Sequence, residues 1–346
     1  MKILVLGGTG AMGTHLIDYL TRNKDVEVTV TSRKERVNHD NIKFIVGNAR
    51  ELTFMLKIVK EVHYDVIVDF MNYNYEEFEE RYHFLLDSCK HYVFLSSSRV
   101  YANHDGRITE GCPRLLETTT DTDFLSTNRY ALRKAREEDM LKSSGRINYS
   151  IIRPYVTYSN RRLQLGIYEK EEWLYRVLND KPIIISEGIL DKITTLTFGK
   201  DVAYGIYKIA LGKPISEPVH ITTMENMTWL EILKLYADII KEEIGKEFII
   251  YTSHEIKSIE ILYEGGYNTI YDRQWNRQFD NTKAEIVCGH IDYFAMKEGL
   301  STCLREFLKD WKDFGNTLFL PLNVKYEIEM DRLTSNRNLQ KELVRL

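Results

Sequence analysis

Two residues that could work together in proton transfer lie four positions apart in the segment TNRYALRKAREEDMLK (127–142). The segment has no proline or glycine, so we expect a helix that carries Tyr130 and Lys134 on one face. A phenol with its ordinary pKa of about 10 transfers protons poorly at neutral pH, and a nearby ammonium improves it by stabilising the phenolate. The pair therefore indicates acid–base chemistry by Tyr130, and the alternative is an ordinary helix surface.

A serine triplet upstream supplies a third candidate. It stands in FLSSSRVYA (94–102), at the end of an apolar stretch that we expect to be a central strand. In doubly wound parallel sheets, ligands bind at the carboxyl ends of the strands. We therefore expect Ser97 to hydrogen-bond the reacting oxygen and to hold it against Tyr130.

The first half of the chain alternates between apolar strands and amphipathic helices. Continuous apolar strands indicate a parallel sheet that is covered on both faces, and so an α/β protein with a doubly wound sheet of the Rossmann type. We expect strands at 2–8, 26–33, 42–48, 64–71, 91–98 and 148–156, and helices at 14–23, 52–62, 75–90 and 128–144.

A glycine-rich turn, in LVLGGTGAMGTHL (4–16), follows the first expected strand and opens a helix. Residues without a Cβ allow a tight turn and let a pyrophosphate approach the backbone, and the helix N-terminus offers free N–H groups. A purely structural turn would have the same GxxGxxG pattern. We expect the turn to bind a dinucleotide through Gly7, Thr9, Gly10, Ala11, Met12 and Gly13.

The end of the second strand indicates which dinucleotide is bound. Sheets that bind NAD usually carry an acidic residue there for the ribose hydroxyls. This chain has Ser32 and Arg33 instead, with Lys34 and Arg36 close by. Because an arginine can bind a 2′-phosphate through two hydrogen bonds, we expect NADP(H) to be favoured over NAD(H). The alternative is a solvated basic loop.

After about residue 157 the pattern loosens into a smaller α+β region. We expect helices at 169–180 and 228–245 and strands at 182–186, 219–223 and 247–252. Thr228 and Glu231 have capping-box spacing, and Gly245 marks the end of the longer helix. We divide the chain into a dinucleotide-binding domain (1–157, with a return segment at 187–212), a substrate-binding region (158–325) and a charged tail (326–346).

The composition argues against several other classes of protein. The 346 residues are 43% apolar and 28% charged, as in soluble globular proteins, and the net charge of −4 gives no sequence-wide attraction to nucleic acids. Four scattered cysteines and nine histidines form no metal-binding spacing, and no apolar run is long enough to span a membrane. The first expected strand leaves no room for a signal peptide, so we expect a cytoplasmic protein without a metal site.

Several motifs together resemble the extended short-chain dehydrogenase/reductase family, in its nucleotide-sugar epimerase and dehydratase branch. They are GGTGAMG, DVIVDF, YVFLSSSRVYA, YALRK for YxxxK, and IIRPYVTYS. The resemblance implies that Tyr130 is the acid/base, that Lys134 supports it and touches the cofactor ribose, and that Ser97 rather than Ser98 is the family's serine or threonine. It also implies cofactor contacts by Asn48, Phe70 and Pro154.

Two departures from the family pattern bear on the reaction. Sugar 4,6-dehydratases of the family usually have Asp-Glu directly after the catalytic threonine, where this chain has Ser98 and Arg99, which argues against a dehydratase. The segment VDFMNYNYEEF (68–78) replaces the small residues that are usual after the fourth strand. It resembles an atypical branch of the family, which includes chloroplast stem-loop RNA-binding proteins.

The resemblance implies hydride transfer at C4 of a nucleotide-linked sugar. We expect an NADPH-dependent 4-ketoreductase, because a cofactor recognised by its 2′-phosphate fits one that is exchanged at every turnover. A nucleotide-sugar 4-epimerase with tightly bound cofactor is the alternative. Alternatives of other classes are a non-catalytic nucleotide- or RNA-binding protein of the same fold and an ether or phenylpropanoid reductase. The helices at 75–90 and 128–144 resemble the family's dimer helices, so we expect a homodimer, without membrane or nucleic-acid partners.

The second half of the chain holds candidates for the substrate. Trp173 or Tyr168 could stack on a base, and the alternative is an amphipathic helix with Trp173 in the core. Basic side chains could bind the diphosphate, although an exposed basic turn would account for the first two of them. These candidates are Arg161, Arg162, Arg273 and Arg277, and Ser98 is added as a possible substrate contact.

Overall fold

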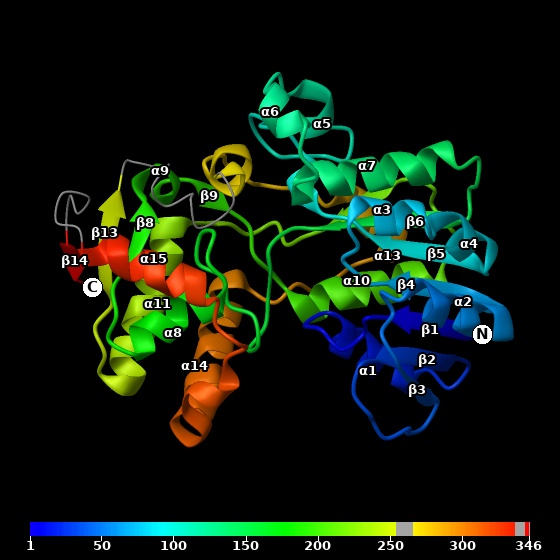
Figure 1. Cartoon of the computed structure of the whole chain (residues 1–346), viewed down its shortest axis with the longest axis horizontal. Helices are drawn as coiled ribbons and strands as arrows, with labels where there is room; N and C mark the ends of the chain where they lie inside the picture. The colour runs from blue at the N-terminus through cyan, green and yellow to red at the C-terminus, as the bar shows by residue number, and fades with distance from the viewer. Residues whose placement is uncertain (254–265, 336–342, 346) are drawn as a thin grey trace.

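Parallel strands form the sheet of the first lobe (Figure 1). The computed structural model describes residues 1–253, 266–335 and 343–345. Within these residues the sheet has seven strands in the order β11-β6-β5-β4-β1-β2-β3, and each neighbouring pair is parallel. The strands are β1 (Lys2–Leu6), β2 (Glu27–Ser32), β3 (Ile42–Val46), β4 (Tyr64–Asp69), β5 (Cys89–Leu95), β6 (Tyr149–Pro154) and β11 (Pro218–Ile221).

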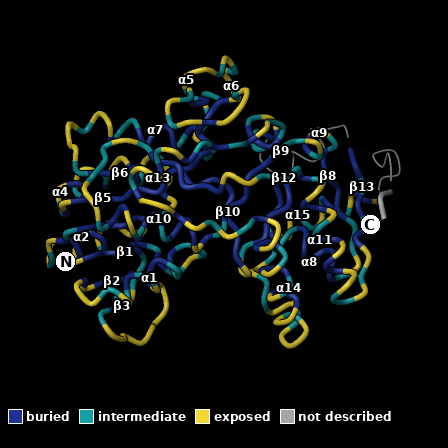
Figure 2. The backbone as a smooth tube through the Cα atoms, turned by 180° about the vertical axis from the view of Figure 1, so that it is seen from behind, coloured by how far each residue is buried: buried dark blue, intermediate teal, exposed yellow. Residues whose placement is uncertain are grey.

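Helices cover both faces of this sheet, as its continuous apolar strands predict. Ile3 and Val5 of β1 face α1 (Gly13–Arg22), α10 (Gly199–Leu211) and α13 (Thr282–Cys288). Leu4 and Leu6 lie in the core on the opposite face, and Figure 2 shows the strands as buried between the two layers. The helices of that face are α2 (Leu52–Glu61), α3 (Tyr75–Glu79), α4 (Tyr82–Asp87) and α7 (Tyr130–Ser143). The predicted doubly wound α/β architecture is confirmed.

The helix expected at 75–90 is broken into α3 and α4. The break falls at Arg81, whose side chain is buried. Its guanidinium lies 4.5 Å from the centroid of the Tyr73 ring, and its Nη2 donates a hydrogen bond to the carbonyl of Arg50 at 3.2 Å. A buried cation needs such partners, which are long-range contacts and leave no periodic signal in the sequence.

A second lobe is built around a three-stranded sheet in the order β14-β13-β8, again within the described residues. In it, β13 (Ile249–Ser253) is parallel to β8 (Ile183–Ser186) and antiparallel to β14 (Leu343–Arg345). The helices of this lobe are α8 (Lys170–Leu178), α9 (Glu187–Leu190), α11 (Trp229–Ile244), α14 (Met296–Phe314) and α15 (Val324–Ser335). This is the smaller α+β region that the sequence predicts.

Shorter elements complete the described structure. β7 (Thr157–Tyr158) pairs with β10 (Thr197–Phe198), and β9 (Ile193–Thr194) pairs with β12 (Met227–Thr228). The short helical segments are η1 (Ser98–Val100), α5 (Leu115–Thr118), α6 (Thr122–Leu125), η3 (Thr269–Arg273) and η4 (Gly315–Leu318). No helix in the described parts of the chain is long and apolar enough to cross a membrane.

The ends of α11 agree with the sequence prediction. The Thr228 hydroxyl accepts a hydrogen bond from the Glu231 N–H at 3.1 Å, and the Glu231 carboxylate accepts one from the Thr228 N–H at 2.6 Å. Gly245 follows the helix with a φ of 68°, which is readily adopted by a residue without a Cβ. Local chemistry alone therefore determined where this helix begins and ends.

The strand expected at 219–223 lies in the other lobe from the one predicted. It forms β11, which pairs with β6 at the edge of the large sheet. Val219 and Ile221 are buried in the first lobe's core, and α10 packs against α1 on the same face. The chain thus returns to the first lobe after residue 198. It stays there through β11, which lies beyond residue 212, where the predicted return segment ends. The division into domains stays a prediction.

The charged tail begins as the helix α15. Arg176 of α8 is buried, and its guanidinium nitrogens lie 2.9 Å from the Glu327 carboxylate and 2.7 Å from that of Asp331. These ion pairs attach α15 to the second lobe. The rest of the predicted tail, at 336–342 and 346, lies outside the described residues.

Candidate active site

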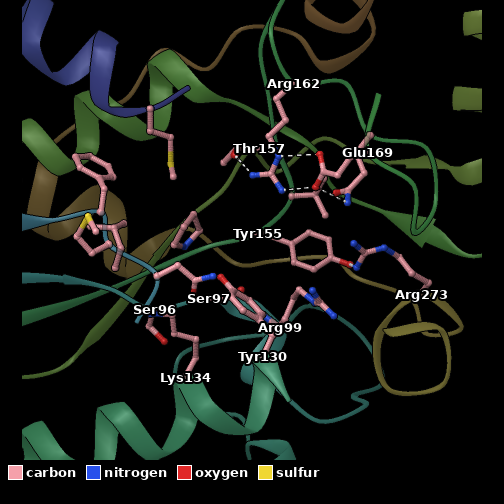
Figure 3. A pocket seen from close by; sticks show the side chains of 18 residues that line it. Ser96, Ser97, Arg99, Tyr130, Lys134, Tyr155, Thr157, Arg162, Glu169 and Arg273 are labelled. Atoms are coloured by element: carbon pink, nitrogen blue, oxygen red, sulfur yellow. Dashed lines mark hydrogen bonds and ion pairs between the residues drawn. The ribbon is translucent and has the colours of Figure 1, made fainter. Parts of the chain in front are cut away.

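The carboxyl ends of β4, β5 and β6 border a cavity of about 330 Å³ (Figure 3). Side chains of the first lobe line one part of it, and residues that follow β6 or belong to η3 line the rest. The lining residues are Met12, Phe70, Met71, Asn72, Leu95, Ser96, Ser97, Arg99, Tyr130, Lys134, Pro154, Tyr155, Val156, Thr157, Arg162, Gln164, Glu169 and Arg273. The structure therefore brings Ser97, Tyr130 and Lys134 to one cavity.

The serine triplet is divided by its hydrogen bonds. Ser96 donates to the Glu138 carboxylate at 2.6 Å, and Ser98 donates to the carbonyl of Arg153 at 2.7 Å. Ser97 Oγ instead accepts a hydrogen bond from the Arg99 N–H at 3.2 Å, which leaves its own hydrogen available to a ligand. Ser98 is fully buried and does not line the cavity. Of these three described serines, Ser97 is therefore the one placed to donate to a reacting oxygen.

Lys134 has a buried counter-ion that the sequence analysis missed. Its Nζ lies 2.8 Å from Glu137 Oε2 and 4.6 Å from the centroid of the Phe94 ring. Glu137 is fully buried, and burial raises the pKa of its carboxyl, although the charge of Lys134 opposes this. The three-residue spacing of Lys134 and Glu137 on one helix is the signal that could have indicated the pair.

Glu138 attaches α7 to the sheet and so positions Tyr130 and Lys134. Its carboxylate lies 2.5 Å from Arg153 Nη2 of β6 and 3.3 Å from Arg114 Nη1. Burial opposes its ionisation, but the charge of Arg153 and the hydrogen bonds from Arg153 and Ser96 hold the pKa of Glu138 below its usual range. Buried charges with this many partners hold a helix in one register against its sheet.

Three arginines and one carboxylate, that of Glu169, line the end of the cavity nearest the second lobe. Arg162 Nη2 donates to Glu169 Oε1 at 2.9 Å, and Arg99 lies with its guanidinium 5.2 Å from the centroid of the Tyr130 ring. Arg273 enters from η3, as Figure 3 shows. Arg161 is exposed and does not line the cavity.

Arg277 is buried behind the cavity rather than in its wall. Its guanidinium donates hydrogen bonds to the carbonyls of Tyr101 and Ala102, both at 3.1 Å, and its Nε lies 2.9 Å from Asp272 Oδ1. All these partners belong to the protein, so the structure gives Arg277 a role in packing, and its predicted contact with substrate stays a prediction.

The two aromatic candidates for a base-stacking site lie in the core of the second lobe. The ring of Trp173 stacks on Tyr236 with centroids 4.9 Å apart, and its Nε1 donates to the carbonyl of Leu163 at 3.0 Å. The Tyr168 hydroxyl donates to the carbonyl of Ile184 at 2.6 Å. Both side chains are buried, which agrees with the alternative interpretation of an amphipathic helix with Trp173 in the core.

The glycine turn fits a phosphate group. Gly7 has a φ of 68°, and a Cβ at Gly13 would lie 2.5 Å from the carbonyl oxygen of Gly8. A Cβ at Gly10 would meet nothing within 4 Å, so the turn faces open space there. α1 begins with no side-chain cap and no acidic residue in its first turn. An uncapped, uncharged helix N-terminus behind an open glycine turn suits an anion.

The other predicted cofactor contacts lie along the same edge of the sheet. Phe70 follows β4, Pro154 is the last residue of β6, and both line the cavity. Asn48 lies after β3 and does not line the cavity. Ser32 is the last residue of β2 and its hydroxyl donates to the carbonyl of Lys34 at 2.8 Å. Arg33 follows it, is exposed, and has no hydrogen-bond or ion-pair partner within the described parts of the chain.

A family model for the NAD-dependent epimerase/dehydratase family matches residues 3–213. The chain belongs to this family. The predictions of an extended short-chain dehydrogenase/reductase fold and of an enzyme of that type are thereby confirmed. The family has a nicotinamide dinucleotide as its cofactor, and the glycine turn described above fits one. The choice between NADP and NAD stays a prediction.

This epimerase/dehydratase chain has distant relatives. It is 25% identical to a dTDP-D-glucose 4,6-dehydratase of Dictyostelium discoideum, in a match that covers 41% of this chain and only 40% of that protein. The solved structure of dTDP-glucose 4,6-dehydratase from Bacillus anthracis, in complex with NAD, superposes with a TM-score of 0.65 at 17% identity, covering 92% of this chain and 100% of that one.

Two solved structures of epimerases resemble this chain to a similar degree. UDP-glucuronic acid 4-epimerase from Bacillus cereus, in complex with NAD, gives a TM-score of 0.65 at 17% identity and covers 92% of this chain and 100% of that chain. UDP-N-acetylglucosamine 4-epimerase from Methanobrevibacter ruminantium M1 gives 0.67 at 17% identity, with 89% and 98% covered. At these identities the likeness establishes the fold of both lobes.

Proposed function

We propose that the protein is an NADPH-dependent 4-ketoreductase, which transfers a hydride from NADPH to C4 of a nucleotide-linked 4-keto sugar. The observation that carries the proposal is the common cavity of Ser97, Tyr130 and Lys134 at the carboxyl edge of a dinucleotide-binding sheet. A phenol, an ammonium and a hydroxyl in one cavity suit the interconversion of an alcohol and a carbonyl, because each can stabilise the oxygen as its charge changes.

Each of the three side chains has a defined task in this proposal. Tyr130 donates its proton to the carbonyl oxygen as that oxygen becomes an alcohol. Ser97 donates a hydrogen bond to the same oxygen, using the hydrogen that its neighbours leave available. Lys134, held by Glu137, stabilises the phenolate that Tyr130 becomes. The dinucleotide, when bound, supplies the hydride.

Two features of the sequence support the proposed reaction and the proposed choice of NADP. Ser98 and Arg99 stand where a dehydratase of this family has Asp-Glu, and Ser98 is fully buried. Arg33 at the end of β2 is exposed and unpaired among the described residues, so its guanidinium is available for a 2′-phosphate. A site that recognises a 2′-phosphate would fit an NADPH that is exchanged and consumed once per turnover, and this supports net reduction over epimerisation.

The test is to mix the purified protein with 4-keto and 4-hydroxy nucleotide sugars, with and without NADPH. We expect one NADPH to be oxidised for each 4-keto sugar reduced, and we expect Tyr130→Phe to abolish this. Tyr175→Phe, on α8 of the second lobe, is the matched control and should keep full activity. Interconversion of C4 epimers without added cofactor would replace reduction by epimerisation, and salt-sensitive RNA binding without turnover would contradict an enzymatic role.

A further inference from the structure

One buried carboxylate is shared by three arginines at the end of the cavity. Asp272 of η3 is 1% exposed. Its oxygens lie 2.9 Å from Arg277 Nε and 3.3 Å from Arg99 Nε, and they also form an ion pair with Arg273. The Tyr155 hydroxyl donates to the same carboxylate at 3.2 Å. A single negative charge is therefore shared by three positive ones and leaves an excess of positive charge.

The neighbouring ion pair does not correct this imbalance. Arg162 and Glu169 form their own pair, so the whole group has four guanidinium groups and two carboxylates. The remaining partners of the three arginines are neutral: Arg273 donates to the carbonyl of Gly166 at 2.9 Å, and Arg99 donates to the side-chain oxygen of Asn268. Neutral oxygens solvate a cation but do not cancel its charge, and a buried uncompensated charge is costly.

The directions of the pKa shifts agree with an excess of positive charge. Burial lowers the pKa of Arg273 to about 10, and the charge of Arg99 lowers it further although Tyr155 opposes this. Burial also lowers the pKa of Arg99, and Arg162 adds to this effect. Each guanidinium would thus be stabilised by an added anion. Because an arginine side chain stays protonated in proteins at neutral pH, the charge is present when a ligand enters.

Part of the excess charge lines the cavity near the Tyr130 ring. Arg99 and Arg273 line the cavity, whereas Arg277 lies behind it. The Arg99 guanidinium is 5.2 Å from the centroid of the Tyr130 ring, and Figure 3 shows it between Tyr130 and the side chains of the second lobe. Arg99 and Tyr130 thus line the same part of the cavity, so a ligand bound to Tyr130 also lies near Arg99.

We propose that the sugar on which Tyr130 acts bears a carboxylate next to the reacting carbon, and that Arg99 binds this carboxylate. The inference rests on the proposed function and specifies its substrate as the nucleotide-linked sugar acids. In a six-membered sugar ring, the diphosphate-bearing C1 lies opposite C4, whereas the exocyclic C6 is attached to the adjacent C5. An anion held beside Tyr130 is accordingly the carboxylate at C6 and not the diphosphate.

The test compares sugars that differ only at C6. The matched pairs are UDP-glucuronate with UDP-glucose and UDP-galacturonate with UDP-galactose, measured by calorimetry at saturating NADP⁺ and by the rate of NADP⁺ reduction. A charge-assisted hydrogen bond to a carboxylate predicts that each acid binds about 10–100-fold more tightly than its neutral partner. Arg99→Met should remove that preference, and Arg99→Lys should keep part of it.

The control is Arg146→Met, which removes an exposed arginine beyond the end of α7 and should leave the preference unchanged. Equal binding of acid and neutral sugars, or no binding of either, overturns the proposal. A preference that persists in Arg99→Met also overturns it, and an equal loss for acid and neutral sugars assigns Arg99 to the diphosphate instead. If Arg99→Met does not fold, the native protein and Arg99→Lys provide the same comparison.

The outcomes separate this inference from the proposed function. Hydride exchange with neutral sugars at the same kcat/KM as with the acids would uphold C4 chemistry and overturn the carboxylate site. Selective binding of the acids without hydride transfer for any sugar in the panel would uphold the carboxylate site and overturn the proposed C4 chemistry.

Discussion

The buried pair of Lys134 and Glu137 can be tested by a double-mutant cycle. The two charged groups lie 2.8 Å apart, and their side chains are 3% and 0% exposed. Removing one member of a buried ion pair typically costs about 3–5 kcal/mol, because the other is left buried and charged. We expect Glu137→Leu to lower the free energy of unfolding by about 3 kcal/mol, the low end of that range, since Lys134 borders the cavity and can gain water.

Removing the lysine of the pair should lower the free energy of unfolding by less. In Lys134→Met the Glu137 carboxylate keeps Arg133, whose Nε lies 3.6 Å away, and its raised pKa allows it to bind a proton. We expect a loss of about 2 kcal/mol. The double variant Lys134→Met/Glu137→Leu should be within about 1 kcal/mol of the wild-type protein, because the cost of burying the two charges roughly cancels their attraction.

The measurement is urea unfolding at pH 7 without ligand, followed by tryptophan fluorescence and far-ultraviolet circular dichroism. Glu61→Leu, at an exposed position at the end of α2, is the control and should change stability by less than about 0.5 kcal/mol. The reasoning is refuted if the single substitutions each cost less than about 1 kcal/mol, or if the double variant loses the sum of the two single losses.

Three further predictions concern catalysis, cofactor choice and acid stability. Tyr130→Phe should lower turnover by about 10²–10⁴-fold while dinucleotide affinity, measured by fluorescence titration, persists, and a variant that keeps more than about a tenth of wild-type turnover would exclude Tyr130 as the acid/base. Arg33→Asp should reverse or erase a preference for NADP(H), so a wild-type protein that binds NAD(H) at least as tightly would contradict the role given to Arg33. Burial lowers the pKa of His91 from 6.5 to about 4, so between these values the unfolded chain binds a proton that the folded protein does not. Stability should therefore fall as pH falls through this window, with His91 contributing a loss of about 2 kcal/mol between pH 7 and pH 5. His91→Gln should lose that part of the pH dependence in denaturant unfolding at the two pH values, and an unchanged dependence would assign it to other groups.

The sequence determined the architecture of the first lobe and indicated which residues meet in its candidate catalytic group. The strands β1, β4 and β5 contain apolar runs because both faces of the sheet are buried, and such a run can be recognised within a single segment of sequence. In a parallel sheet the carboxyl ends of such strands meet at one edge, so Ser97 after β5 and the pair on α7 could be expected to converge. Local capping chemistry likewise determined both ends of α11.

Only the tertiary structure decided which polar side chains face the cavity. Arg273 and Arg277 are equivalent in sequence pattern, yet the former lines the cavity and the latter is bound to backbone carbonyls behind it. Arg99 is linked to Asp272 across 173 positions of the chain, and Trp173 stacks on Tyr236 in the core. Contacts of this kind depend on how distant segments exclude water together, which no local periodicity records.

The same reason accounts for the two differences in the fold. The break between α3 and α4 depends on the partners that the buried Arg81 finds in Tyr73 and Arg50. The position of β11 depends on β6, whose edge it completes. Sequence periodicity specified that these segments are helical or extended, because that choice depends on neighbours within a few residues. Which surface each segment covers was decided by the burial of side chains that are far apart in the chain.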